Sequence, residues 1–305
     1  MNCINFEDLT NEKQLLVQEY YNICSNISIM DYGIQGKTYL VTGASGGIGL
    51  SISKILLEEE ANVIVHYNTN RARVDELISQ YPDYTSRILP VQADLTNEES
   101  VKQMFQIIKE KYGRIQGLIN NAGIWPSDDI PIHKMSLEHW NHTLQTNLTA
   151  YFLCTREFIS QLTNYPNDPY ATIVLIGSTA GIFGEADHID YSVTKAALQG
   201  LMLSVKNELP RISRYGRVNI VSPGWTATPM AKEGLADKKN VSKVLQTTAM
   251  RKIAKPEDVA HVVCFLLSDK LSGHVSGQNI AVTGGMEGRL LYYPDQVDAS
   301  KPTGE

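Results

Sequence analysis

Short runs rich in β-branched and apolar residues alternate with longer amphipathic segments along most of this chain. Runs of the first kind have the length of strands, and the segments between them have the period of helices. The predicted strands are Thr38–Thr42, Asn62–Tyr67, Ile88–Gln92, Gly117–Asn120, Thr172–Ile176, Val218–Val221 and Asn279–Val282. The predicted helices are Ile48–Glu59, Arg71–Gln80, Glu98–Tyr112, Leu137–Thr163, Ser192–Ser213 and Pro256–Leu267. This alternation predicts an α/β fold in which helices cover both faces of a parallel sheet.

Additional segments flank this predicted domain at both ends. Residues 1–35 are predicted to form an N-terminal helical extension, in which Thr10 or Asn11 is placed to cap a helix. Residues 36–286 hold the alternating elements, and residues 287–305 form a C-terminal tail. Neither an internal repeat nor a Pro-rich linker divides the middle part. We therefore predict a single α/β domain with an addition at each end.

Composition excludes several classes of partner. The 305 residues carry a net charge of -6, and an acidic balance argues against nucleic acid. No apolar run approaches the ~18 residues of a membrane span, and no secretory signal opens the chain. The four cysteines form no CxxC pair, which fits a reducing compartment, and no cluster has metal-ligand spacing. We predict a cytoplasmic protein with no membrane partner and no metal.

A glycine-rich turn follows the first predicted strand. Thr42–Gly49 reads Thr-Gly-Ala-Ser-Gly-Gly-Ile-Gly and leads into an amphipathic helix. Such a turn lets the backbone approach a pyrophosphate, while the helix N-terminus supplies N–H groups and a partial positive charge. Because glycine-rich turns also merely connect elements, its place between a strand and a helix is what favours a dinucleotide site.

Two further segments stand where predicted strands end. Asp94 is placed either to accept a hydrogen bond from an adenine amino group or to cap the next turn. The run Asn120–Gly123 has small residues that let a ribose lie against the sheet edge, although a plain strand-ending turn is the alternative. Ligands of open α/β sheets bind beyond the carboxyl ends of the strands, where all these segments fall.

Tyr191 and Lys195 lie four residues apart in a predicted helix, so their side chains share one face. A fixed cation near a phenol stabilises the phenolate and lowers its pKa from about 10. A pair with this spacing is usually only two surface residues. The chemistry therefore depends on the other segments.

Together these residues resemble the classical short-chain dehydrogenase/reductase family from about Gly36 to Met286. Ser178 precedes Tyr191 by 13 residues, as in such enzymes. The resemblance implies a Rossmann-type, doubly wound sheet of seven parallel strands. The matching positions are Thr42–Gly49, Asp94, Asn120–Gly123, Asn147, Ser178, Tyr191–Lys195 and Pro223-Gly224.

The resemblance also implies roles for individual residues. Tyr191 is the expected acid or base, Ser178 binds the substrate oxygen, Lys195 holds the nicotinamide ribose, and Asn147 holds a water in a proton relay. The expected cofactor contacts are Gly43, Ser45, Gly47, Ile48, Gly49, Tyr67, Asn68, Arg71, Asp94, Leu95, Asn121, Ala122, Gly123, Tyr191, Lys195, Pro223, Gly224, Thr226 and Thr228.

The end of the second predicted strand bears on the choice of nicotinamide. An Asp there would bind the 2′-hydroxyl of NAD, but this chain has Tyr67 and Asn68. Arg71 or Arg73 is placed to pair with a 2′-phosphate, unless both are solvated helix residues. The glycine turn lacks the basic residue of many NADP-preferring relatives. On balance we predict NADP(H) over NAD(H).

The expected activity is interconversion of a small-molecule carbonyl and a secondary alcohol, with a ketone reductase of specialised biosynthesis favoured. A 3-oxoacyl-thioester reductase is the alternative, disfavoured because a net charge of -6 does not suggest a Lys- and Arg-rich docking surface for an acyl carrier. A non-catalytic nucleotide-binding regulator and an epimerase or dehydratase are less favoured. Trp125, His188 and Asp190 are among the expected pocket residues. We also expect a homo-oligomer, a tetramer or a dimer, formed through the two longest helices, and a tail that crosses a subunit boundary.

Overall fold

The structure is a computed structural model that describes residues 31–126 and 128–304. Most of the predicted N-terminal extension, including Thr10 and Asn11, lies outside the described residues.

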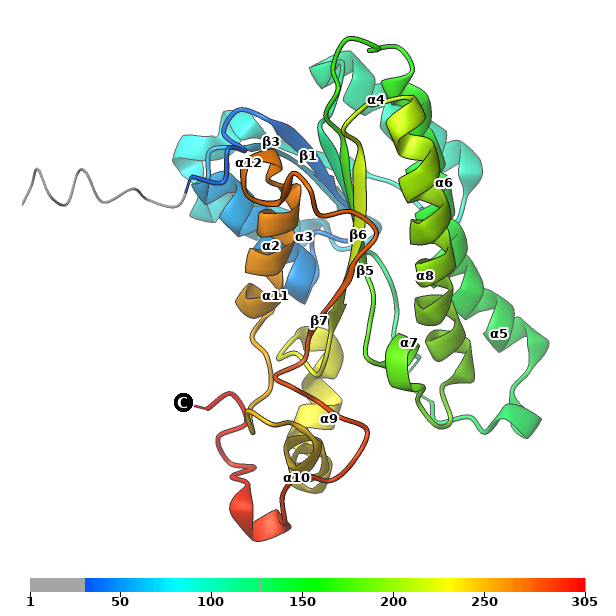
Figure 1. The fold of residues 1–305 in the computed structure, drawn as a ribbon, viewed down its shortest axis with the longest axis vertical. Coiled ribbons are helices and arrows are strands. Elements are labelled where there is room, and N and C mark those ends of the chain that lie inside the picture. The colour runs from blue at the N-terminus through cyan, green and yellow to red at the C-terminus, as the bar shows by residue number, and fades with distance from the viewer. Residues whose placement is uncertain (1–30, 127, 305) are drawn as a thin grey trace, which may run out of the picture. The chain divides into compact units, whose positions relative to one another are not determined.

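Seven parallel strands form one sheet in the order β3-β2-β1-β4-β5-β6-β7 (Figure 1). The strands are β1 (Thr38–Val41), β2 (Asn62–Tyr67), β3 (Ile88–Gln92), β4 (Gly117–Asn120), β5 (Thr172–Ile176), β6 (Arg217–Pro223) and β7 (Asn279–Val282). The predicted single α/β domain with a parallel, doubly wound sheet is confirmed. The bounds of two predicted strands were wrong: β1 stops at Val41 instead of Thr42, and β6 is longer at both ends.

Helices cover both faces of the sheet, so its central strands are buried throughout. Every residue of β1, β4, β5 and β6 is buried. Helices α2 (Gly47–Glu58) and α11 (Pro256–Leu267) pack together on one face, and α4 (Glu98–Tyr112), α6 (Ala150–Leu162) and α8 (Ile189–Glu208) lie on the other (Figure 1). Helix α3 (Arg71–Gln80) connects β2 to the segment before β3.

Helix α4 shows how local sequence fixes an element. The side chain of Asn97 accepts a hydrogen bond from the backbone N–H of Ser100 at the start of the helix, and Glu98 and Glu99 lie in its first turn. Gly113 ends the helix with a φ of 67°. Caps and charges of this kind explain why the predicted bounds were correct.

The long helix predicted at Leu137–Thr163 contains an irregular segment. It consists of α5 (Leu137–Leu144), a π-helical turn (Gln145–Thr149) and α6. The wider π turn shifts the phase of the residues that follow it, and such turns are frequent at functional sites. Asn147, completely buried, lies within this turn.

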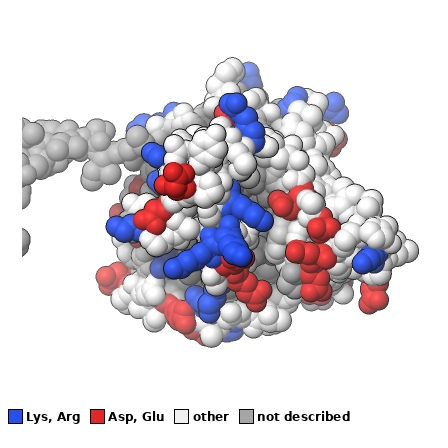
Figure 2. All heavy atoms as spheres, turned by 90° about the horizontal axis from the view of Figure 1, so that it is seen from below, with Lys and Arg blue, Asp and Glu red and all other residues white. Residues whose placement is uncertain are grey.

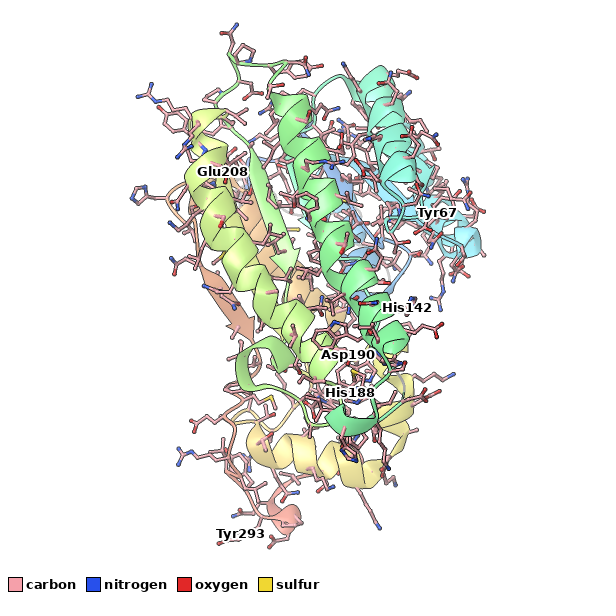
Figure 3. All side chains as sticks on the ribbon, turned by 90° about the vertical axis from the view of Figure 1, so that its right-hand side faces the viewer. Tyr67, His142, His188, Asp190, Glu208 and Tyr293 are labelled. Carbon is pink, nitrogen blue, oxygen red and sulfur yellow. The ribbon has the colours of Figure 1, made fainter. Side chains whose placement is uncertain are left out.

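Helix α8 begins earlier than predicted and is shorter at its far end. It starts at Ile189, and its last turns give way to a 3₁₀ turn over Leu209–Arg211. Tyr191 and Lys195 consequently lie in the first two turns of the helix. Figure 3 shows α8 beside α5 and α6, with His188 and Asp190 at one end of α8 and Glu208 at the other.

The C-terminal tail packs against the helices that follow β6. Short helices α9 (Lys232–Ala236) and α10 (Lys238–Thr247) occupy the segment between β6 and α11. Val297 and Ala299 of the tail pack on a small apolar cluster that includes Val241 and Leu245 of α10, and the tail runs beside α10 in Figure 1. The tail thus contacts its own chain, and its crossing of a subunit boundary stays a prediction.

Candidate active site

The glycine turn packs so closely against the segment after β4 that side chains at two of its glycines would clash with that segment. Gly43 has a φ of +63°, and a Cβ atom built there would lie 2.8 Å from the Cα of Ala122. A Cβ on Gly49 would lie 2.5 Å from the side-chain nitrogen of Asn121. Glycine is therefore required at both positions to keep the turn close to the segment after β4.

The N-terminus of α2 fits an anionic group. Among the described residues no side chain caps this helix, and its first turn holds no acidic residue. Its backbone N–H groups and the positive end of its dipole therefore face the glycine turn. Ser45, Gly47 and Ile48 lie in or directly after this turn, as a bound pyrophosphate requires. The geometry fits a dinucleotide.

Thr42 and Asn121 fasten the turn to the strand ends. The hydroxyl of Thr42 accepts hydrogen bonds from the backbone N–H groups of Asn121 at 2.8 Å and Ala122 at 3.0 Å. The Asn121 amide donates to the carbonyl oxygens of Thr42 and Gly43. This explains why Asn-Asn-Ala-Gly stands after β4: its second Asn holds the glycine turn.

His66 is a further support of the turn, and sequence reasoning missed it. Its Nδ1 accepts a hydrogen bond from the Gly43 N–H at 3.0 Å, and its Nε2 donates to the carbonyl oxygen of Ala93 at 3.0 Å. Since Nδ1 must accept, the ring is neutral with its proton on Nε2. Burial lowers the pKa of His66 to about 4, so it stays neutral near pH 7. The one sequence feature that could have indicated this role is the presence of a histidine inside a largely apolar strand.

The adenine end of the predicted site is shallow. Asp94 is exposed, and one carboxylate oxygen accepts hydrogen bonds from the backbone N–H and the hydroxyl of Thr96. The turn-capping alternative is thus present, and the exposed carboxylate also lines a surface hollow with residues at the start of α4. Leu95 is buried beneath it.

Arg71 is the first residue of α3, shortly after β2 ends at Tyr67. Its guanidinium donates to the Tyr67 hydroxyl at 3.2 Å and pairs with Asp75 at 2.9 Å. The pair is half exposed, so it contributes little to stability. Asn68 and Arg73 beside it are exposed. Arg71 is thus an exposed cation whose charge is shared with Asp75.

Ser178, Tyr191 and Lys195 converge beyond the end of β5. A hydrogen bond joins the side chains of Ser178 and Tyr191, and the Lys195 Nζ lies 5.7 Å from the centroid of the Tyr191 ring. The Ser178 Oγ also accepts a hydrogen bond from the backbone N–H of Ala180. The structure thus brings together three of the four residues predicted as the catalytic set.

The pKa values in this cluster differ from our expectation. Burial raises the pKa of Tyr191, and its hydrogen bond to Ser178 opposes that rise. We had expected Lys195 to lower this pKa. Burial also lowers the pKa of Lys195 to about 7, so its ammonium is only partly charged near neutral pH and acts more weakly on the phenol.

Asn147, the fourth predicted catalytic residue, fixes the segment after Gly123. Its amide oxygen accepts from the Ile124 N–H at 2.8 Å, and its amide nitrogen donates to the Ile124 carbonyl at 2.9 Å. A Cβ on Gly123 would lie 2.9 Å from the Asn147 oxygen and 3.7 Å from the Lys195 Nζ. All four residues therefore meet at one place.

The segment after β6, predicted to contact the nicotinamide, packs between β7 and the glycine turn. Pro223 ends the strand, the Gly224 N–H bonds to the Val282 carbonyl, and the Thr226 hydroxyl donates to the Gly224 carbonyl. A Cβ on Gly47 would lie 2.6 Å from the Thr228 side chain. Thr228 therefore sits against the glycine turn, next to the expected pyrophosphate.

Trp125 packs against both Tyr191 and His188. Its ring lies 4.8 Å from the Tyr191 ring and 4.2 Å from the His188 ring, centroid to centroid. The His188 Nε2 lies 3.0 Å from a carboxylate oxygen of Asp129. The indole thus contacts both the buried imidazole of His188 and the ring of Tyr191.

Asp190 does not line the pocket, contrary to our prediction. Its carboxylate is completely buried and accepts a 2.5 Å hydrogen bond from the Thr143 hydroxyl, with the His139 Nε2 at 3.3 Å from the same oxygen. Because residues on a helix rotate by 100° each, the neighbour of Tyr191 points away from it, toward α5. Figure 3 shows His188 and Asp190 at this end of α8.

Comparisons with known proteins identify the family. The family model described as "Enoyl-(Acyl carrier protein) reductase" matches residues 43–287. A 3-oxoacyl-[acyl-carrier-protein] reductase of Thermotoga maritima is 32% identical over 253 residues, covering 83% of this chain and 98% of the relative. One of Synechocystis sp. is 33% identical with the same coverage. A short-chain dehydrogenase/reductase structure from Brucella melitensis, described as "Glucose/ribitol dehydrogenase", has a TM-score of 0.75 and 27% identity, covering 87% of this chain and 100% of that one.

The chain belongs to the short-chain dehydrogenase/reductase family, as its motifs predicted. It is an NAD(P)-dependent oxidoreductase. No helix in the described part of the chain is long and apolar enough to cross a membrane.

Proposed function

We propose that this protein reduces a ketone to a secondary alcohol, or catalyses the reverse oxidation, at the hydroxyl of Tyr191. The observation that carries the proposal is the convergence of Ser178, Tyr191 and Lys195 beside a cradle that fits a dinucleotide. A nicotinamide supplies or accepts the hydride when bound. The remaining chemistry is a proton transfer at the substrate oxygen.

The protein's own residues account for that proton transfer. The raised pKa keeps Tyr191 protonated at neutral pH, so it is a donor to an oxygen that gains negative charge. Ser178 supplies a second hydroxyl at the same oxygen and orients the phenol. Trp125 and His188 keep water from one side of the phenol. Asn147 holds the backbone of Ile124 where the proposed relay passes.

For the substrate, a 3-oxoacyl thioester is favoured over the small ketone that we first preferred. The names of the relatives support it. A local feature also supports it, because Lys232, Lys238, Lys239 and Lys243 are exposed on α9 and α10. In Figure 2, Lys and Arg side chains gather near the middle of one face, with Asp and Glu side chains on both sides of them. Local charge, and not the net charge, decides whether an acidic carrier can dock.

NADP(H) remains the proposed cofactor. Neither Tyr67 nor Asn68 offers a carboxylate that would repel a 2′-phosphate, and Arg71 is half exposed beside them. Pairing with phosphate would require Arg71 to leave or share Asp75, which costs little at a solvated site.

We also propose a cytoplasmic homo-oligomer, a dimer or a tetramer, with residues 36–286 as its catalytic domain. The outer faces of α6 and α8 support this, because Phe152, Val193 and Leu203 are exposed there. Mass measurement in solution tests it: a monomer at all concentrations would contradict the proposal.

The proposed reaction is tested by following nicotinamide absorbance with NADPH and with NADH. The substrates are acetoacetyl linked to acyl carrier protein, acetoacetyl linked to coenzyme A, and a panel of free ketones. Turnover with the thioesters and NADPH is expected, with the carrier-linked form giving the lower KM. Turnover only with free ketones would contradict the thioester substrate and favour a small ketone. Absence of any turnover would overturn the proposed reaction.

A further inference from the structure

Tyr151 contacts Lys195 but belongs to neither the predicted catalytic set nor the predicted cofactor contacts. It lies in the first turn of α6, and its side chain is 1% exposed. Its hydroxyl lies 3.3 Å from the Lys195 Nζ and 3.2 Å from the Ile176 carbonyl oxygen. The Lys195 Nζ donates to that same carbonyl at 2.9 Å. The three groups form a closed triangle at the end of β5.

We propose that Tyr151 is a positioning residue, whose hydroxyl fixes the Lys195 ammonium for the reaction at Tyr191. This inference rests on the proposed function. It assigns Tyr151 no contact with substrate or with the reacting atoms.

The hydrogen-bond directions in the triangle are determined. The Ile176 carbonyl can only accept, so the Tyr151 O–H donates to it and the oxygen of Tyr151 accepts from Lys195. An ammonium has three N–H groups. Two of them are committed to Ile176 and Tyr151, and the third is left for the side where Gly123 and Tyr191 lie. A ribose hydroxyl bound on that side would accept a hydrogen bond from this third N–H of Lys195, whose direction the other two bonds fix.

The π turn explains how Tyr151 reaches this place. The turn ends at Thr149, two residues before Tyr151, and shifts the phase of α6 relative to α5. The ring of Tyr151 consequently lies beside the lysine, with the Lys195 Nζ 5.1 Å from its centroid. The turn and the helix after it thus supply two polar side chains near Lys195: Tyr151 contacts it, and Asn147 holds the segment after Gly123.

The buried surroundings of Lys195 make the Tyr151 hydroxyl important for keeping the lysine charged. Burial alone lowers the pKa of Lys195, and a hydroxyl acceptor favours the charged form. The titratable side chains facing Lys195 are Tyr191 on its own helix and Tyr151 on α6, while β5 contributes a backbone carbonyl and the π turn an amide. Burial raises the pKa of Tyr151 far above its ordinary value, so it remains a neutral acceptor.

The test compares Tyr151→Phe with Tyr39→Phe. Both tyrosines are 1% exposed, but the Tyr39 hydroxyl has no hydrogen-bond partner in the described part of the chain. The first readout is the pH profile of kcat/KM. Tyr151→Phe is expected to shift the limb that depends on charged Lys195 by about one unit toward lower pH, since a hydrogen bond to a charged group is lost. The profile of Tyr39→Phe is expected to match the wild type.

The second readout does not require activity. Urea unfolding of the wild type, Tyr151→Phe, Lys195→Met and the double variant gives the coupling between the two side chains. The expected destabilisation by Tyr151→Phe is at least threefold smaller, as an equilibrium constant, when Lys195 is already replaced. Additive effects together with an unshifted pH profile would overturn the proposal. An inactive wild type that shows the coupling would instead overturn only the proposed function.

Discussion

Replacing His66 by Asn should remove a pH dependence of stability that one buried imidazole imposes on the fold. The folded protein holds His66 neutral with a pKa of about 4, against 6.5 for a free histidine. Below about pH 6.5 the unfolded chain binds a proton that the folded chain does not. Stability must therefore fall as the pH drops from 6.5 to 4, and it must be independent of this residue above that window.

The size of the effect follows from the two pKa values. Integrating proton binding from pH 7 to pH 5 gives a loss of about 2 kcal/mol, and the full window gives at most about 3.4 kcal/mol. No discount for solvent screening applies, because His66 is only 2% exposed. Protonation at Nδ1 would also break the hydrogen bond from Gly43.

The assay is urea unfolding at about pH 7 and about pH 5, at a fixed protein concentration. The wild type should lose about 2 kcal/mol more than His66→Asn between these two conditions. His261→Asn, which alters an exposed histidine on α11, is the matched control and should behave as the wild type. Equal losses in wild type and His66→Asn would refute the assigned tautomer and the role of His66 in holding the glycine turn.

Three further predictions concern the cofactor and the tail. Gly49→Ala should weaken NADPH binding about tenfold or more, because its Cβ would lie 2.5 Å from the Asn121 amide; an unchanged Kd in a fluorescence titration would contradict the cradle. Arg71→Glu should raise the KM for NADPH about tenfold with little change for NADH, and equal changes for both would argue against a phosphate contact. Deleting residues 287–305 should lower stability by about 1 to 4 kcal/mol, since Val297 and Ala299 cover the cluster on α10. The same deletion should raise the KM for substrate while leaving NADPH affinity unchanged, and unaltered values would show that the tail does not brace α10.

The sequence predicted most of the architecture because the fold depends on local patterns. These strands are short runs rich in apolar and β-branched residues, so β2, β3, β4, β5 and β7 were predicted with their observed bounds. The caps of α4 and the proline at the start of α11 likewise mark helix ends in the sequence. The family motifs then identified Ser178, Tyr191 and Lys195, which converge in the structure. Spacing along the chain alone would not have predicted these contacts.

Hydrogen bonds between residues far apart in the chain could not be predicted from the sequence. The pairing of His66 with Gly43 and Ala93, and of Tyr151 with Lys195, spans 23 to 44 positions and leaves no periodic signal. The π turn was missed because one wide turn hardly alters helical periodicity. The direction of the Tyr191 pKa shift was predicted wrongly because spacing reveals a neighbouring lysine but not the burial that outweighs it.

The central claim is that the Tyr191 hydroxyl delivers the proton while the dinucleotide binds elsewhere on the same rim. The most direct measurement pairs turnover with NADPH affinity for Tyr191→Phe, which removes one oxygen from a buried ring. We predict a loss of kcat of at least about a thousandfold with a Kd for NADPH within about threefold of the wild type. Turnover close to that of the wild type would contradict the assignment of this hydroxyl as the acid–base group.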